Sequence, residues 1–76
     1  MSQYINDIKY LSQQAPLTYE ILAQLRNGYK RPAISKSLNI PTWKYDRTLQ
    51  YACIRYHCNS YYQLICKASE AGAFDG

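Results

Sequence analysis

The spacing of apolar residues constrains the fold of this chain most strongly, because it follows the three- and four-residue steps of a helix. No stretch of useful length alternates apolar and polar residues as a strand would. The helical pattern is broken at four places: Ala15-Pro16, Asn27-Gly28, Asn39-Ile40-Pro41 and His57-Cys58-Asn59. A residue before proline avoids helical geometry, and glycine accepts the left-handed conformation that ends helices. The sequence therefore predicts an all-α domain of short helices and short loops.

Four of the five predicted helices have a start signal, and all five have an inward-facing stripe. Thr18, Thr42 and Ser60 are predicted N-caps, because their hydroxyl groups can accept from free first-turn amides, and Arg31-Pro32 opens the third helix. The fourth helix is expected over about 42–56, and the fifth is expected to end at Gly72. The residues expected to face inward are, helix by helix, Tyr4, Ile5, Ile8 and Leu11; Ile21, Leu22 and Leu25; Ile34 and Leu38; Tyr45, Leu49, Ala52, Cys53 and Tyr56; and Leu64, Ile65 and Ala68.

The charge is concentrated in the middle of the chain. The whole protein carries +4, while residues 26–55 hold seven basic side chains against Asp46 alone, and the ends are mildly acidic. A basic centre indicates one positive face and a polyanionic partner such as nucleic acid. The alternative is a solvated helix surface. The nine tyrosines are unusual, and rings with an apolar body and a polar tip suit core edges and interfaces.

Several classes of protein are disfavoured. The apolar runs are far shorter than the roughly 20 residues of a membrane span, and no secretory signal opens the chain, so we expect a cytoplasmic protein. Cys53, Cys58 and Cys66 are odd in number and contain no C-x-x-C, which predicts reduced thiols without a metal or cofactor. An enzyme is not expected. The nearest approach to a nucleophile–base pair is Cys53 with His57, and this pair alone is weak support for catalysis.

A longer pattern runs through residues 17–68. It consists of Leu25-x-x-Gly28, Ile34-Ser35-x-x-Leu38-x-Ile40-Pro41, Tyr45, Leu49, Ala52, Arg55, Tyr56, Cys58, Gln63 and Leu64. In these positions the sequence resembles the LuxR-type (GerE-like) helix-turn-helix domain of bacterial transcription regulators. The resemblance implies a four-helix domain at 16–76, preceded by a short N-terminal helix at 1–15. It also implies a free-standing regulator of transcription, because the sensing domain common in that family has no counterpart here.

The resemblance implies a sequence-specific contact with double-stranded DNA. A helix-turn-helix lays its second helix, here about 42–56, in the major groove. The side chains expected at base edges are Thr42, Trp43, Lys44 and Arg47. Those expected at phosphates, which position the protein without reading sequence, are Lys30, Arg31, Lys36 and Arg55.

Each of these residues also has a purely structural interpretation. Trp43 could cover the edge of the core, and Thr42 could serve only as a helix cap. Arg47 could pair with Asp46 or Glu20 at the surface, in an ion pair of little energetic weight. Lys36 could equally well be a solvated surface lysine.

The last helix is the expected dimer surface, as is usual in LuxR-type domains. It offers Tyr61, Tyr62 and Cys66, and a homodimer would double the DNA site. The N-terminal helix could pack on the domain or contact a protein partner. The alternative function is a protein-interaction module that keeps the fold and pairs with another regulator. Pro41 and Thr48, which stand where the family has serine and histidine, favour this alternative.

Overall fold

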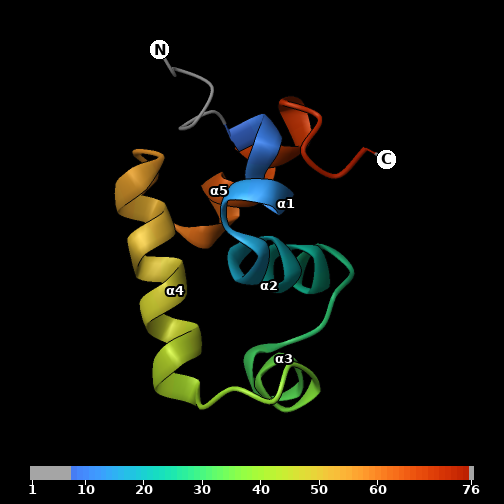
Figure 1. Cartoon of the computed structure of the whole chain (residues 1–76), viewed down its shortest axis with the longest axis vertical. Helices are drawn as coiled ribbons and strands as arrows, with labels where there is room; N and C mark the ends of the chain where they lie inside the picture. Colours follow the sequence, from blue (N-terminus) through green and yellow to red (C-terminus); the bar gives the residue numbers. More distant parts are fainter. Residues whose placement is uncertain (1–7, 76) are drawn as a thin grey trace.

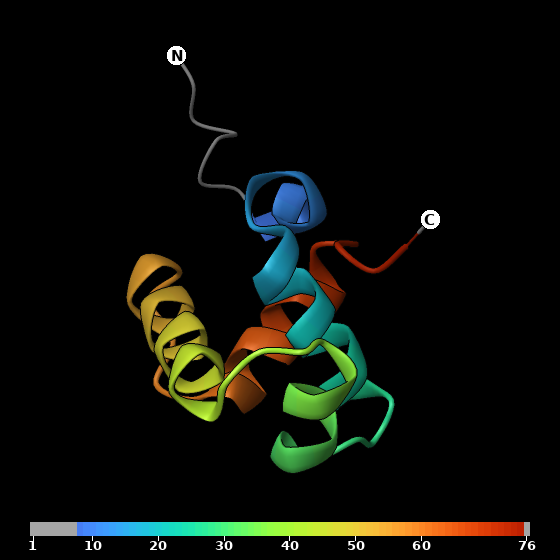
Figure 2. The ribbon, with the colours of Figure 1, turned by 60° about the horizontal axis from the view of Figure 1, so that its bottom comes forward.

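The computed structural model describes residues 8–75 and confirms an all-α fold, with no strand in that range. Its elements are the 3-10 turn η2 (Ile8–Tyr10), α1 (Leu11–Gln14), α2 (Pro16–Arg26), α3 (Arg31–Ser37), α4 (Thr42–Arg55) and α5 (Tyr61–Glu70). The longest helix, α4, runs along one side of the molecule, and α3 lies beside its beginning (Figure 1). The helices α2 and α5 fill the middle, and α1 lies at the other end (Figures 1 and 2).

Two of the three predicted N-caps are wrong. The helices α2 and α4 begin one residue after Ala15 and Pro41, and neither start has a side-chain cap hydrogen bond. Thr18 is instead buried in the first turn of α2, and Thr42 is the first residue of α4. Pro16 is preset for the first turn of α2. At α4, the amides of Lys44 and Tyr45 donate to the backbone carbonyl of Pro41, which stands at the cap position in place of Thr42.

The third predicted cap is confirmed. The Ser60 hydroxyl accepts a hydrogen bond from the Gln63 amide at 3.3 Å, at the start of α5. The Gln63 side chain reaches back and accepts from the Asn59 amide at 2.6 Å. Two amides that the helix cannot satisfy by itself are thus paired, much as in a capping box.

The helix ends follow the predicted breaks. Gly28 and Gly72 adopt φ values of 98° and 81°, in the left-handed region that ends helices. Two other residues adopt the same region without being glycine, Asn39 at 56° and His57 at 60°. Asparagine tolerates this conformation. Histidine adopts it at a steric cost, so the packing around the turn after α4 must keep the His57 backbone in place.

The core consists of two groups of side chains that meet between α2 and α4. The larger group holds the buried residues Ile8, Leu11, Leu22, Ala52, Tyr56, Leu64, Ala68 and Ala73. The smaller group joins α2, α3 and α4 through Ile21, Ile34 and Tyr45. Leu25 and Leu49 pack against both groups, which makes the core continuous. Most of the predicted inward stripe is therefore confirmed; Tyr4 and Ile5 lie outside the described residues.

The N-terminal segment shares this core. Ile8 and Leu11 are buried in the larger group, so residues 8–14 pack on the helices that follow. None of the helices in residues 8–75 combines the length and the apolar character that a membrane crossing requires.

Candidate nucleic-acid interface

The helices α3 and α4 are joined by a short turn over residues 38–41. Asn39 takes a positive φ, and the Ile40 amide returns to the Ser35 carbonyl at 3.0 Å. Ile34 from α3 and Tyr45 from α4 are buried together on α2. The first turn of α4 is therefore fixed on the core by one side, and its other side is left to solvent.

The four predicted base contacts all lie on this first part of α4 and are exposed. The Trp43 side chain is 61% exposed, so it does not cover the core edge. The Arg47 guanidinium lies over its ring, 5.7 Å from the ring centroid. This cation–π contact favours a position of Arg47 near Trp43. Lys44 and Arg47 present donors of the kind that recognise guanine edges.

The predicted phosphate contacts are less uniform. Lys30 immediately precedes α3, Lys36 lies in its last turn and Arg55 lies in the last turn of α4; all three are exposed. Arg31 instead makes a bidentate ion pair with Asp46, with nitrogen–oxygen distances of 2.9 and 2.7 Å. The sequence had offered Asp46 or Glu20 as a partner for Arg47, whereas Asp46 pairs with Arg31.

The ion pair joins the start of α3 to α4 and neutralises Arg31. Its hydrogen bonds raise the pKa of the Arg31 guanidinium and lower the pKa of the Asp46 carboxyl. Both side chains are about half exposed, at 50% and 54%. The carboxylate occupies one edge of the guanidinium, through Nε and one terminal nitrogen, and this contact orients the two helices and offsets the charge that Arg31 would present to a phosphate.

Three further residues share the outward face of α4. Gln50, Tyr51 and Ile54 are exposed, and Tyr51 and Ile54 are 62% and 65% exposed. They follow Trp43 and Arg47 at helical spacing, which places all five opposite the buried Tyr45 stripe. The same spacing is readable in the sequence, so a count of the outward positions of the helix would have found them.

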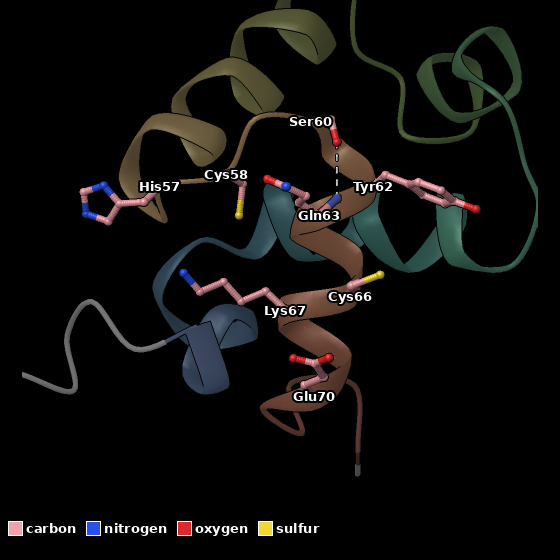
Figure 3. A pocket seen from close by; sticks show the side chains of 8 residues that line it. All are labelled: His57, Cys58, Ser60, Tyr62, Gln63, Cys66, Lys67 and Glu70. Carbon is pink, nitrogen blue, oxygen red and sulfur yellow. Dashed lines mark hydrogen bonds between the residues drawn. The ribbon is translucent and has the colours of Figure 1, made fainter.

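The predicted dimer residues are exposed on α5. Tyr62 is 73% exposed, and Figure 3 shows Tyr62 and Cys66 on the same side of the helix. Tyr61 lies beside Tyr62, with ring centroids 6.3 Å apart. Lys67 points the other way, and its Nζ donates to the Tyr56 carbonyl at 2.7 Å (Figure 3). Lys67 therefore holds the end of α4 and lies away from the side of α5 that carries Tyr62 and Cys66.

A shallow cavity of about 350 Å³ beside α5 gathers side chains with potential chemistry, among them His57, Cys58, Cys66 and Glu70 (Figure 3). In residues 8–75, however, no three histidine, cysteine or acidic side chains are placed to hold a metal ion. Burial raises the pKa of the Cys53 thiol, which keeps that thiol protonated and unreactive.

No protein-family model matches the chain, and searches of curated proteins and of solved structures found no significant match.

Proposed function

We propose that this protein binds double-stranded DNA through the outward face of α4 and regulates transcription. One observation carries the proposal. The turn before α4 and the buried Tyr45 fix the first part of this helix, while Trp43, Lys44 and Arg47 stay exposed on it. A helix held on one side, with donors on the other, has the form that enters a major groove. The resemblance of the sequence to LuxR-type domains supports the same assignment.

The charges supply a reason for affinity. Lys30 and Lys36 lie at the two ends of α3, close in the chain to the helix that would read the bases. Lysines at these positions suit the phosphates on either side of a major groove, which would set the register of α4. The proposal places the protein in the cytoplasm, on the nucleoid when it is bound to DNA.

The proposed active form is a homodimer through α5. One small module buries only about 600–1,000 Å² on DNA, which limits the affinity for a specific sequence. Tyr61, Tyr62 and Cys66 are exposed together on α5 and would form the contact. Tyrosine is enriched at protein interfaces because its ring gives contact area at low conformational cost. The expected DNA site is therefore palindromic.

The test is a selection of bound fragments from a random DNA pool at low and near-physiological salt. A Lys44→Ala/Arg47→Ala variant is carried in parallel. An enriched palindromic motif that the variant fails to select would support the proposal. Recovery without a motif, lost at higher salt and equal for the variant, would contradict it and leave only nonspecific attraction.

A second function is favoured by the outward face itself. Trp43, Tyr51 and Ile54 are apolar and exposed, and Arg47 is a cation among them. Tryptophan, tyrosine and arginine are the residues that most often dominate protein interfaces. The alternative proposal is that α4 pairs with another regulator instead of DNA. Binding to a partner that persists at high salt, with no DNA motif selected, would favour this alternative.

A further inference from the structure

A groove of about 620 Å³ lies away from the outward face of α4. It is bounded by the loop between α2 and α3, by α4 and by the start of α5. Its volume is in the range of cavities that hold small organic ligands, about 300–1,000 Å³. Its lining includes residues of α4 and α5, the helices proposed to read DNA and to form the dimer.

The lining of the groove is aromatic and aliphatic. Leu25, Leu49 and Ile65 supply aliphatic surface. Four of the nine tyrosines of the chain also line it: Tyr29, Tyr45, Tyr61 and Tyr62. The rings of Tyr29, Tyr61 and Tyr62 are exposed to solvent. A flat molecule lying between them would cover part of their apolar area. This lining favours a planar apolar body.

The Tyr45 hydroxyl adds a specific polar group. The residue is only 4% exposed and lines the groove, and within residues 8–75 its hydroxyl has no hydrogen-bond partner. Burial raises the pKa of Tyr45, so the hydroxyl stays protonated and remains a donor. Because Tyr45 lines the groove and its hydroxyl makes no hydrogen bond within the described residues, a ligand atom in the groove can accept from it.

The charges at the groove favour an anion. Lys30 lines it and is exposed, so it carries a free positive charge. The other two charged residues of the lining, Arg31 and Asp46, neutralise each other in their bidentate pair. The net charge of the lining is therefore positive, which attracts a carboxylate and disfavours a cation.

We propose that this groove binds a small planar organic anion, such as an aromatic carboxylate. The ring lies among Tyr29, Tyr61 and Tyr62, and the carboxylate accepts from the Tyr45 hydroxyl and lies toward Lys30. The proposal does not require that the protein bind DNA. A second copy of the chain is the competing occupant, because Tyr61 and Tyr62 also belong to the proposed dimer surface, and the experiment must separate the two.

The test is a titration of the full-length, ¹⁵N-labelled protein with sodium 2-naphthoate, followed through the amide chemical shifts. We expect saturable binding at about millimolar affinity or tighter, with the shifts concentrated at residues 28–31, 45–49 and 61–65. Tyr45→Phe keeps the ring and should weaken binding about tenfold, since it removes a hydrogen bond to a charged acceptor. Tyr61→Ala changes an exposed residue and should weaken it about fivefold.

The matched control is Tyr51→Ala, which removes an equally large ring from the outward face of α4 and should leave the affinity unchanged. Neutral 2-naphthamide should bind more weakly than the carboxylate. The proposal would be overturned by shifts centred on Trp43, Tyr51 and Ile54, by affinities equal in the Tyr45→Phe, Tyr61→Ala and native proteins, or by equal binding of the amide. An affinity that falls at about tenfold higher protein concentration would also overturn it, because a second copy would then cover the groove.

Discussion

The two long faces of α4 use similar side chains for opposite purposes. The inward face holds Tyr45, Ala52 and Tyr56, all nearly inaccessible to solvent. The outward face holds Trp43, Tyr51 and Ile54, each more than half exposed. Both faces are rich in apolar and aromatic groups, so hydrophobicity alone does not distinguish them. They differ in what packs against them. The helices α2, α3 and α5 cover the inward face, whereas the described residues leave the outward face mostly open to solvent.

This difference indicates which residues the fold needs and which it does not. Residues of the inward face join the two parts of the core, so they determine stability. The apolar residues of the outward face add little to that core, and an exposed apolar stripe on a small protein is usually a contact surface. The following experiments test this division, from the largest expected effect to the smallest.

The first experiment replaces one tyrosine on each face of α4. Tyr45→Ala should lower the free energy of unfolding by about 3–5 kcal/mol, because it leaves a cavity among Ile21 and Ile34. Tyr51→Ala should change it by less than about 0.5 kcal/mol. Urea unfolding followed by circular dichroism measures both values. Equal losses in the two variants would mean that the faces are not distinct.

The second experiment removes charge from the outward face. Lys44→Ala/Arg47→Ala should reduce the affinity for a selected DNA fragment about 100-fold, because two donors at base edges are lost. Its thermal stability should stay close to that of the native protein, since both residues are exposed. Trp43 is the single tryptophan and lies under Arg47, so its fluorescence reports binding directly.

The control for this charge change is Lys9→Ala, in η2 at the far end of the molecule from α3 (Figure 1). It should reduce the affinity only slightly, through the net charge. A loss as large as that of the double variant would show that binding depends on total charge and that α4 has no special part in it.

The third experiment leaves both faces intact and changes only the turn that ends α4. His57→Gly should raise the free energy of unfolding by about 1 kcal/mol, because glycine adopts the left-handed conformation without steric cost. Asn39→Gly is the matched change in the turn before α4, and its gain should be smaller, since asparagine tolerates this conformation. Chemical denaturation of the two variants should rank them in this order; a loss of stability in His57→Gly would contradict the strain at this turn.

The smallest effect is expected at the Arg31–Asp46 pair, which lies between the two faces. The folded state lowers the pKa of Asp46, so its contribution is present above the ordinary pKa of an aspartate and is lost as the pH falls through the lowered value. Asp46→Asn should therefore have a slightly lower melting temperature than the native protein near neutral pH. The gap should close in acid. A gap that does not change with pH would show that the pair contributes nothing through ionisation.

The sequence by itself determined α2 to α5 and their inward residues. Helical periodicity and the prolines and glycines at the breaks are local properties, so they were sufficient to place α2 to α5 within a residue or two. The exposure of Thr42, Trp43, Lys44 and Arg47 also followed from periodicity, once Tyr45 and Leu49 had been placed inside. The caps at Thr18 and Thr42 failed, because both helices begin before the position that a threonine cap would require.

Only the tertiary structure decided which residues from different helices meet. The partner of Asp46 is 15 positions away in the chain, and no local pattern distinguishes Arg31 from Arg47 for that role. The groove likewise combines Tyr29, Tyr45 and Tyr61 from three separate segments. Local sequence sets which side of each helix is apolar, whereas the packing of the helices sets which of those sides are covered. The uncovered sides, the outward face of α4 and the tyrosine groove, are the ones on which the proposed functions depend.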